Sequence, residues 1–342
     1  MSGALNIPTI RQSQGRRRRI VTGVLVALLI TGAGLTLTIG QSVTTPLSVL
    51  RVLLGGDSGA EAFTIRVLRL PRAVLAALAG MCFGMGGVAF QTLLRNPLAS
   101  PDIIGINSGA SAAAVFAIVM LHMSGAQVSV IAVSAGLGVA LLIYLLAWKG
   151  GAAGSRLILV GIGVASMLQS FIAYVLTQAP SWSLQQAMRW MTGSVNGAQL
   201  GQALPLIGAL VVFGGILLAM RRDLETLRMG DEVAAGLGVR IGATRLIVIC
   251  AAVGLVAFAT AASGPIAFVA FMSGPIAARL LRRGDALLVP AALVGAVLVL
   301  FADFAGQVLL PARYPVGIVT GVLGAPYLIF LIIRDNRTGG AL

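Results

Sequence analysis

Charged residues are scarce in this sequence. Only 10% of its 342 residues are charged, whereas 58% are hydrophobic, and a soluble domain normally carries about 25% charged residues. This composition excludes an ordinary soluble domain and indicates a membrane protein with several spans. The net charge of +14 does not indicate nucleic-acid binding, because the arginines flank apolar runs and form no basic face with interleaved aromatics.

Side chains that perform catalysis or bind metals are equally rare. The sequence has one histidine, His122, one lysine, Lys149, and two cysteines, Cys82 and Cys250, which lie in apolar runs. No Cys/His cluster has the spacing of a metal site, and the cysteines are expected to be packing residues. Lys149 does not follow a glycine-rich phosphate loop, so no Walker A motif is present. We predict no enzyme activity, no metal and no cofactor on this chain, so any energy from ATP must come from a partner.

Acidic residues are too few for a proton pathway. Of the ten, Asp303 alone lies clearly inside an apolar run, and Asp102 stands at the start of another. A carboxylate is costly in lipid, so Asp303 should face other helices and form hydrogen bonds, while Asp102 is expected to cap its helix. We favour a structural role for Asp303 over a proton relay. This scarcity of acidic residues disfavours a secondary transporter driven by protons or sodium.

Ten apolar runs approach the length of about 20 residues that a helix needs to cross a membrane. The first has too long an apolar core for a cleaved signal peptide, so we interpret it as an uncleaved helix. Two mixed stretches, residues 41–66 and 179–200, are expected at the outer membrane surface, where Trp182 and Trp190 would suit the interface. The expected spans cover residues 20–40, 73–94, 103–121, 128–147, 156–177, 203–220, 243–262, 265–281, 286–309 and 316–333.

These spans predict an all-α integral membrane protein with about ten transmembrane helices. One domain, residues 20–334, lies between a basic tail, residues 1–19, and a short tail, residues 335–342. An even number of spans leaves both tails on one side, and the positive-inside rule makes that side cytoplasmic. All but six of the 24 basic residues fall there; the exceptions are Arg51, Arg66, Arg69, Arg72, Arg189 and Arg313.

The second expected span is rich in glycine. Gly80 and Gly84 share one helical face, with Gly87 close by, and Gly105 and Gly109 follow shortly after the span. Small residues at such spacing let helix backbones approach closely in lipid. We expect these glycines to pack helices together.

The most informative cytoplasmic stretch is the charged segment 221–240. Within it, Asp231 and Glu232 follow Gly230 and open a short expected helix over residues 233–237. Acidic residues suit the first turn of a helix, and a glycine ends it. Such a helix can dock into a groove of another protein, although the pattern alone fits a plain surface loop equally well.

Several stretches together resemble the FecCD-type permeases of ATP-driven importers for iron chelates and cobalamin. The resemblance spans roughly residues 45–334 and implies a multi-pass permease of the bacterial inner membrane. It also implies a second permease chain, two ATPase subunits and a substrate-binding protein as partners. The matching motifs are Arg69-Leu-Pro-Arg72 before the glycine-rich helix, Asn96-Pro97-Leu98-Ala99, Ser155-Arg-Leu-Ile-Leu-Val-Gly161, Gly230-Asp-Glu-Val-Ala-Ala-Gly-Leu-Gly238, Gly264-Pro-Ile-Ala-Phe-Val269 and Pro315-Val-Gly-Ile-Val-Thr320.

This resemblance implies roles for three sets of residues. The set that couples to the ATPase comprises Gly230, Asp231, Glu232, Ala235, Gly236, Leu237 and Gly238. The set that docks the binding protein comprises Arg66, Arg69, Arg72 and Arg313, for which anchoring at the interface is the alternative. The candidates for a cytoplasmic gate are Gly154 and Ser155, for which a flexible turn is the alternative.

Two positions depart from the family pattern. Arg313-Tyr314 stands where similar proteins usually carry an acidic residue, and Gly274-Pro275 shifts an expected proline in the eighth span. The local sequence after Gly264 resembles siderophore permeases, so a ferric siderophore is the expected substrate. Cobalamin and haem are alternatives, as is a membrane scaffold without transport.

Overall fold

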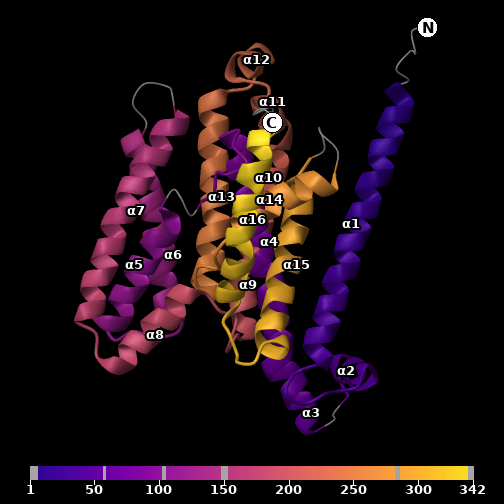
Figure 1. The fold of residues 1–342 in the computed structure, drawn as a ribbon, viewed down its shortest axis with the longest axis vertical. Helices are drawn as coiled ribbons and strands as arrows, with labels where there is room; N and C mark the ends of the chain where they lie inside the picture. The colour runs from indigo at the N-terminus through magenta and orange to yellow at the C-terminus, as the bar shows by residue number, and fades with distance from the viewer. Residues whose placement is uncertain (1–6, 57–58, 102–104, 148–152, 282–285, 338–342) are drawn as a thin grey trace.

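The computed structural model describes residues 7–56, 59–101, 105–147, 153–281 and 286–337, and every regular element in these ranges is a helix. The expected cap Asp102 and the lysine Lys149 lie outside these ranges. Figure 1 shows a set of roughly parallel helices with two small helices, α2 (Pro46–Leu53) and α3 (Ala60–Phe63), at one end and α12 (Asp231–Gly236) at the other.

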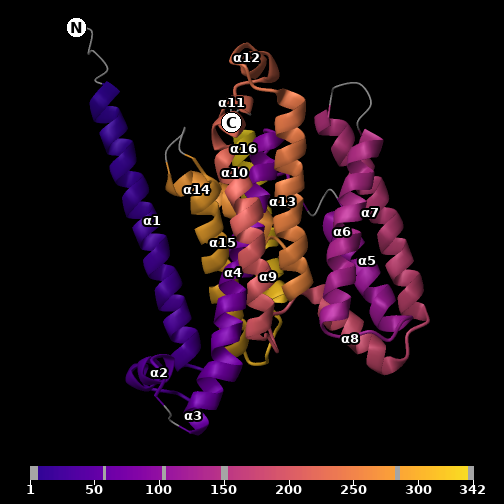
Figure 2. The ribbon, with the colours of Figure 1, turned by 180° about the vertical axis from the view of Figure 1, so that it is seen from behind.

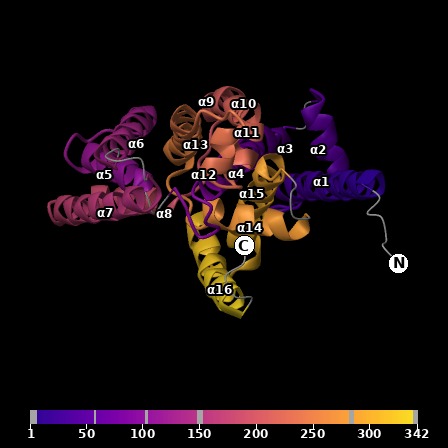
Figure 3. The same ribbon diagram turned by 90° about the horizontal axis from the view of Figure 1, so that it is seen from above.

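Helix α4 (Leu70–Leu93) is the centre of the molecule. It packs against α13 (Ile241–Ser263), α14 (Val269–Leu280) and α15 (Leu288–Phe304), and Figure 3 shows it enclosed by them. The span that contains α4 is 78% buried. Its glycines make this possible, because small residues let backbones approach closely.

A second group of helices lies beside this core. It contains α5 (Ile106–Val119), α6 (Ala126–Ala147), α7 (Ala153–Thr177) and α8 (Ser181–Thr192), which pack mainly on one another. Figure 1 shows this group as a separate column beside α13, and α6 is the helix of the group that packs most against α13. The interfacial helix expected around residues 179–200 is α8.

The sixth expected span is built from short pieces that run on from one another. They are the 3₁₀ turn η2 (Leu200–Gln202), α9 (Ala203–Ala209), the π turn η3 (Leu210–Gly214) and α10 (Gly215–Ala219). Two short helices follow at the α12 end of the molecule: α11 (Arg221–Leu227) and α12 itself. Two further π turns extend α4 and α15, namely η1 (Thr64–Arg69) and η4 (Ala305–Leu309).

The first and last helices lie on the outside of the core. Helix α1 (Ile7–Thr38) packs chiefly against α15, and α16 (Val316–Arg337) packs against α14 and α15. Residues 7–19 were expected to be a polar tail, but α1 continues through the four arginines 16–19 into this stretch. Arginine is a good helix former, so nothing in the sequence stops the helix at the membrane surface.

The ten expected spans all correspond to helices. Among the described residues, eight helices are long and apolar enough to cross a membrane, and two shorter apolar helices, α5 and α14, occupy the third and eighth positions. Figures 1 and 2 show that α1 begins and α16 ends at the end of the molecule where α12 lies. This arrangement agrees with an even number of crossings.

Candidate functional site

Helix α4 ends in a turn that aims a charged side chain at α12. The Arg95 N–H donates to Thr92 O (3.3 Å) and the Asn96 N–H to Gln91 O (3.1 Å), which is the hydrogen-bond pattern of a Schellman cap. Arg95 has a φ of 51°, a left-handed conformation that glycine usually supplies at this position. The chain therefore retains an arginine where backbone geometry favours glycine.

The Arg95 guanidinium is held by the first residue of α12. Its Nη2 donates to Asp231 Oδ1 at 2.8 Å, and Nη2 of Arg245 in α13 donates to Asp231 Oδ2 at 2.8 Å and to Oδ1 at 2.9 Å. One carboxylate thus joins α12 to the end of α4 and the start of α13. We call Arg95, Asp231 and Arg245 the coupling triad.

Helix α12 is short and mostly exposed. Two glycines with positive φ, Gly230 (115°) and Gly238 (85°), bound it, and Ala234 is its buried contact. Val233 and Leu237 expose 47% and 67% of their surface. An exposed apolar pair beside acidic and small residues is the kind of surface that a partner protein covers. Glu232, Ala235 and Gly236 lie on the same exposed helix.

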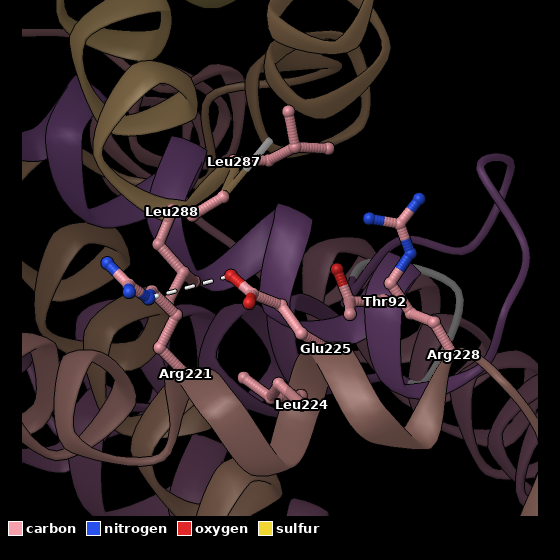
Figure 4. Close-up of a pocket in the computed structure, with 8 residues that line it drawn as sticks. Thr92, Arg221, Leu224, Glu225, Arg228, Leu287 and Leu288 are labelled. Carbon is pink, nitrogen blue, oxygen red and sulfur yellow. Dashed lines mark ion pairs between the residues drawn. The ribbon is translucent and has the colours of Figure 1, made fainter. Parts of the chain in front are cut away.

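A small hollow lies beside α11, where this helix meets the end of α4 and the start of α15. It holds about 20 Å³, the space of a single water, and its lining includes Thr92, Leu224 and Leu288. Figure 4 shows Arg221 and Glu225 of α11 pointing toward each other at its edge, with 3.5 Å between Nε and Oε1. This hollow is a small gap in the packing of the three helices, and it is too small to bind a cofactor.

The opposite end of α4 carries a buried ion pair. Arg72 Nε donates to Asp303 Oδ2 and Arg72 Nη2 to Asp303 Oδ1, both at 2.7 Å. Asp303 is fully buried and also accepts from Gln307 Nε2 at 3.0 Å, while Arg72 donates to Asn196 Oδ1 at 2.9 Å. Asp303 therefore faces other helices and is fully hydrogen-bonded, in a structural arrangement that joins α4 to α15.

Two other outer arginines bind backbone carbonyl groups. The Arg69 guanidinium is buried and donates to Leu37 O at 2.8 Å and to Thr44 Oγ1 at 3.1 Å. Arg66 donates to Val52 O at 2.7 Å, close to the end of α2. These bonds fix the connection between α1 and α4, so the two side chains have an architectural role whatever they contact outside.

Arg313 lies near the start of α16, and its guanidinium faces the side-chain amide of Gln41, whose oxygen accepts from it once the amide is oriented for that bond. Of the four arginines expected to dock a binding protein, Arg69 and Arg72 are thus turned inward. Docking by these residues stays a prediction, and Arg66 and Arg313 are the two that the structure leaves exposed.

The glycines expected to pack helices do so in different ways. A Cβ at Gly84 would collide with the carbonyl oxygen of Ala291 in α15, and one at Gly109 would lie 2.7 Å from Val139 in α6. Gly105 differs, because it precedes α5 with a φ of 82° and is a turn residue outside any helix. Gly80 meets the backbone of α15, and Gly87 meets that of α14.

The gate candidates Gly154 and Ser155 lie in the first turn of α7; their side chains are outside the described set. Sequence reasoning did not find the coupling triad, because Arg95 and Arg245 are far apart in the chain and were seen only as charges that flank spans.

Together, the fold and this site define a class of protein. A bundle of membrane-length helices with an exposed short helix tied to its central span is the architecture of a multi-pass membrane transport subunit. A model of the FecCD transport family matches residues 24–334. The chain belongs to this family of permease subunits of ABC importers in the inner membrane.

Individual relatives agree along nearly the whole chain. The achromobactin transport system permease CbrC of Dickeya dadantii is 38% identical over 323 residues, 93% of this chain and 92% of that protein. The ferric enterobactin transport permease FepG of Escherichia coli is 37% identical, with 94% and 98% covered. A solved inward-facing structure of a metal-chelate type ABC transporter, 26% identical, superposes with a TM-score of 0.80 over 92% of this chain and 99% of that one.

Proposed function

We propose that this chain forms the translocation path of an importer for ferric siderophores. The observation that carries the proposal is the identity of 38% and 37%, over more than nine-tenths of the chain, to permeases named for achromobactin and ferric enterobactin. A substrate-binding protein would deliver the cargo at the end of the molecule with α2 and α3. Two ATPase subunits would supply the energy at the α12 end and would hold the ATP and Mg²⁺.

The surface of α7 supports pairing with a second permease chain. Only 17% of its spanning segment is buried within this chain. Ser166, Gln169 and Ser170 are exposed on it, and the two serine hydroxyls donate to carbonyl groups of α7 itself. Polar side chains at membrane depth face a bundle interior or a water-filled path rather than lipid. We assign this face to the path that two permease chains enclose.

The coupling triad supplies a route from the ATPase to the core. Because Asp231 binds Arg95 and Arg245 at once, a displacement of α12 pulls on both α4 and α13. These are the two helices that hold the core together through α14, α15 and α6. The motion is thereby passed to packed helices, which move as discrete bodies.

The substrate is tested by uptake in iron-limited cells with and without the gene for this chain. We expect loss of uptake of an iron-labelled siderophore, restored by a plasmid copy, with uptake of labelled cobalamin and haem unchanged. Loss of cobalamin or haem uptake alone would overturn the siderophore assignment and keep the importer. Uptake that persists with ATP depleted and stops with an uncoupler would favour a secondary transporter.

The docking role of α12 is tested by co-purification with the ATPase subunit. Leu237→Glu places a charge in the centre of the exposed apolar pair, so we expect at least a tenfold loss of bound ATPase, since desolvating an unpaired charge at an interface is costly. Val43→Glu is the matched control, because Val43 is 80% exposed at the other end of the molecule. Equal ATPase recovery for both variants would contradict the proposed docking.

A further inference from the structure

The N-terminal part of helix α1 diverges from the core. At Gly32 the helix touches α15 so closely that a Cβ would lie 2.9 Å from Leu300 Cδ2 and from Phe301 Cε2. Toward its start it leans away from α15, as Figures 1 and 2 show. The divergence leaves a groove of about 530 Å³ between the two helices. The groove lies at the cytoplasmic end, where α15 begins.

The groove has a basic mouth and an apolar wall. It is lined by Gly15, Arg18, Arg19 and Thr22 of α1 and by Val289 and Pro290 of α15. Arg18 is half-buried, and neither Arg18 nor Arg19 forms an ion pair with any residue that the structure describes. Arg17 lies outside the lining and is held differently, because its Nε donates to the backbone oxygen of Leu280 at 3.0 Å.

This combination matches the chemistry of one ligand. A groove between spans at the cytoplasmic surface, with arginines at headgroup level and apolar side chains beneath, binds lipids with anionic headgroups. Guanidinium groups pair with phosphate oxygens through parallel hydrogen bonds. The volume is ample for part of an acyl chain, and the wall of Val289 and Pro290 gives that chain an apolar surface.

We propose that the α1–α15 groove binds an anionic phospholipid of the cytoplasmic leaflet, with the phosphate held by Arg18 and Arg19. The lipid fills the space that α1 leaves and braces the helix against α15. The site is independent of the imported substrate and of the ATPase contact, because its lining residues belong neither to the coupling triad nor to the exposed face of α7.

The test uses the purified full chain in nanodiscs of phosphatidylcholine with or without phosphatidylglycerol, with bound lipid counted by native mass spectrometry. The wild type should retain phosphatidylglycerol in preference to phosphatidylcholine. Arg18→Gln with Arg19→Gln should lower that preference about 25-fold, since each arginine near an anionic headgroup is worth about fivefold. The double variant Arg16→Gln with Arg222→Gln removes the same charge from exposed positions outside the groove and should retain the lipid.

A second variant tests whether the space in the groove, and not charge alone, is needed to bind the lipid. Thr22→Trp places an indole ring in the groove and leaves every arginine in place, so it should obstruct the lipid and lower its binding as Arg18→Gln with Arg19→Gln does. Retention of lipid by Thr22→Trp, equal binding of the two lipids by the wild type, or equal losses in both double variants would each overturn the proposal. Displacement by inorganic phosphate as readily as by phosphatidylglycerol would overturn the acyl-chain part of the site.

Discussion

At the scale of single residues, the most consequential contact is the ion pair between Arg72 and Asp303. Both oxygens of the carboxylate accept from Arg72, and the Asp303 side chain is 1% exposed. A buried pair of this kind adds little net stability over an apolar pair, but it is costly to break on one side. Its main effect is to specify how α4 meets α15.

We therefore expect Arg72→Ala to be the most destabilising change at the outer end. It leaves Asp303 buried without its charge partner, which costs about 3–5 kcal/mol. Thermal unfolding of the purified chain in detergent, followed by tryptophan fluorescence, measures the loss. The double variant Arg72→Met with Asp303→Leu removes both charges and should recover most of it. A double variant as unstable as Arg72→Ala would show that packing, not the unpaired charge, causes the loss.

At the other end of α4, a change at Arg95 should affect coupling to the ATPase without affecting stability. Its pair with Asp231 is well exposed, with 41% and 39% of the two side chains accessible, so it contributes about 0–1 kcal/mol to stability. Arg95→Gly suits the left-handed φ and keeps the cap. We expect unchanged thermal stability but at least about a fivefold lower uptake per ATP hydrolysed in the reconstituted importer, the low end of typical coupling energies.

The control for this prediction is Arg95→Lys, which retains a positive charge near Asp231. It should preserve most of the coupling ratio. Normal coupling in Arg95→Gly would mean that α12 moves the core without the triad, and Arg245 would then be the residue to change next.

At the scale of elements, close packing of α4 depends on particular glycines. A Cβ at Gly87 would lie 2.8 Å from Ala270 Cα in α14, and backbone cannot move aside as a side chain can. We expect Gly87→Ala to destabilise the chain by about 1–3 kcal/mol, the usual cost of overpacking. The measurement is again thermal unfolding in detergent.

Gly138 in α6 is the matched control, since a Cβ there would meet nothing within 4 Å. Gly138→Ala should be neutral or stabilising by up to about 1 kcal/mol, because alanine is the better helix former. Similar losses in both variants would show that the cost arises within the helix itself and not from contact with α14.

The spans could be predicted because the length of each apolar run matches the thickness of the membrane's hydrocarbon core. The sequence predicted α6, α7 and α13 within three residues at each end. It did not predict that α1 would begin at Ile7, since charge does not end a helix. The short helix opened by Asp231 was expected, but its partners were not, because contacts between distant residues leave no periodic signal in one sequence.

At the scale of the whole molecule, charge asymmetry fixes the orientation. Arg95, Arg221 and Arg245 lie with α12 at one end, while Arg66 and Arg69 lie with α2 at the other. Arginine-rich ends stay in the cytoplasm, so α12 should be reached from inside the cell and the loop before α2 from outside. This orientation is what allows one end to meet an ATPase and the other a delivered substrate.

Single cysteines test this orientation in a chain whose Cys82 and Cys250 have been changed to alanine. Val43 is exposed shortly before α2, and Leu237 is exposed directly after α12, so a cysteine at either position is accessible. A maleimide that cannot cross membranes should label Val43→Cys in intact spheroplasts and Leu237→Cys only after the membrane is opened. Labelling of Leu237→Cys in intact spheroplasts would mean that the chain has the opposite orientation in the membrane. It would place α12 where no ATP is available, and the coupling role of the triad would fall with it.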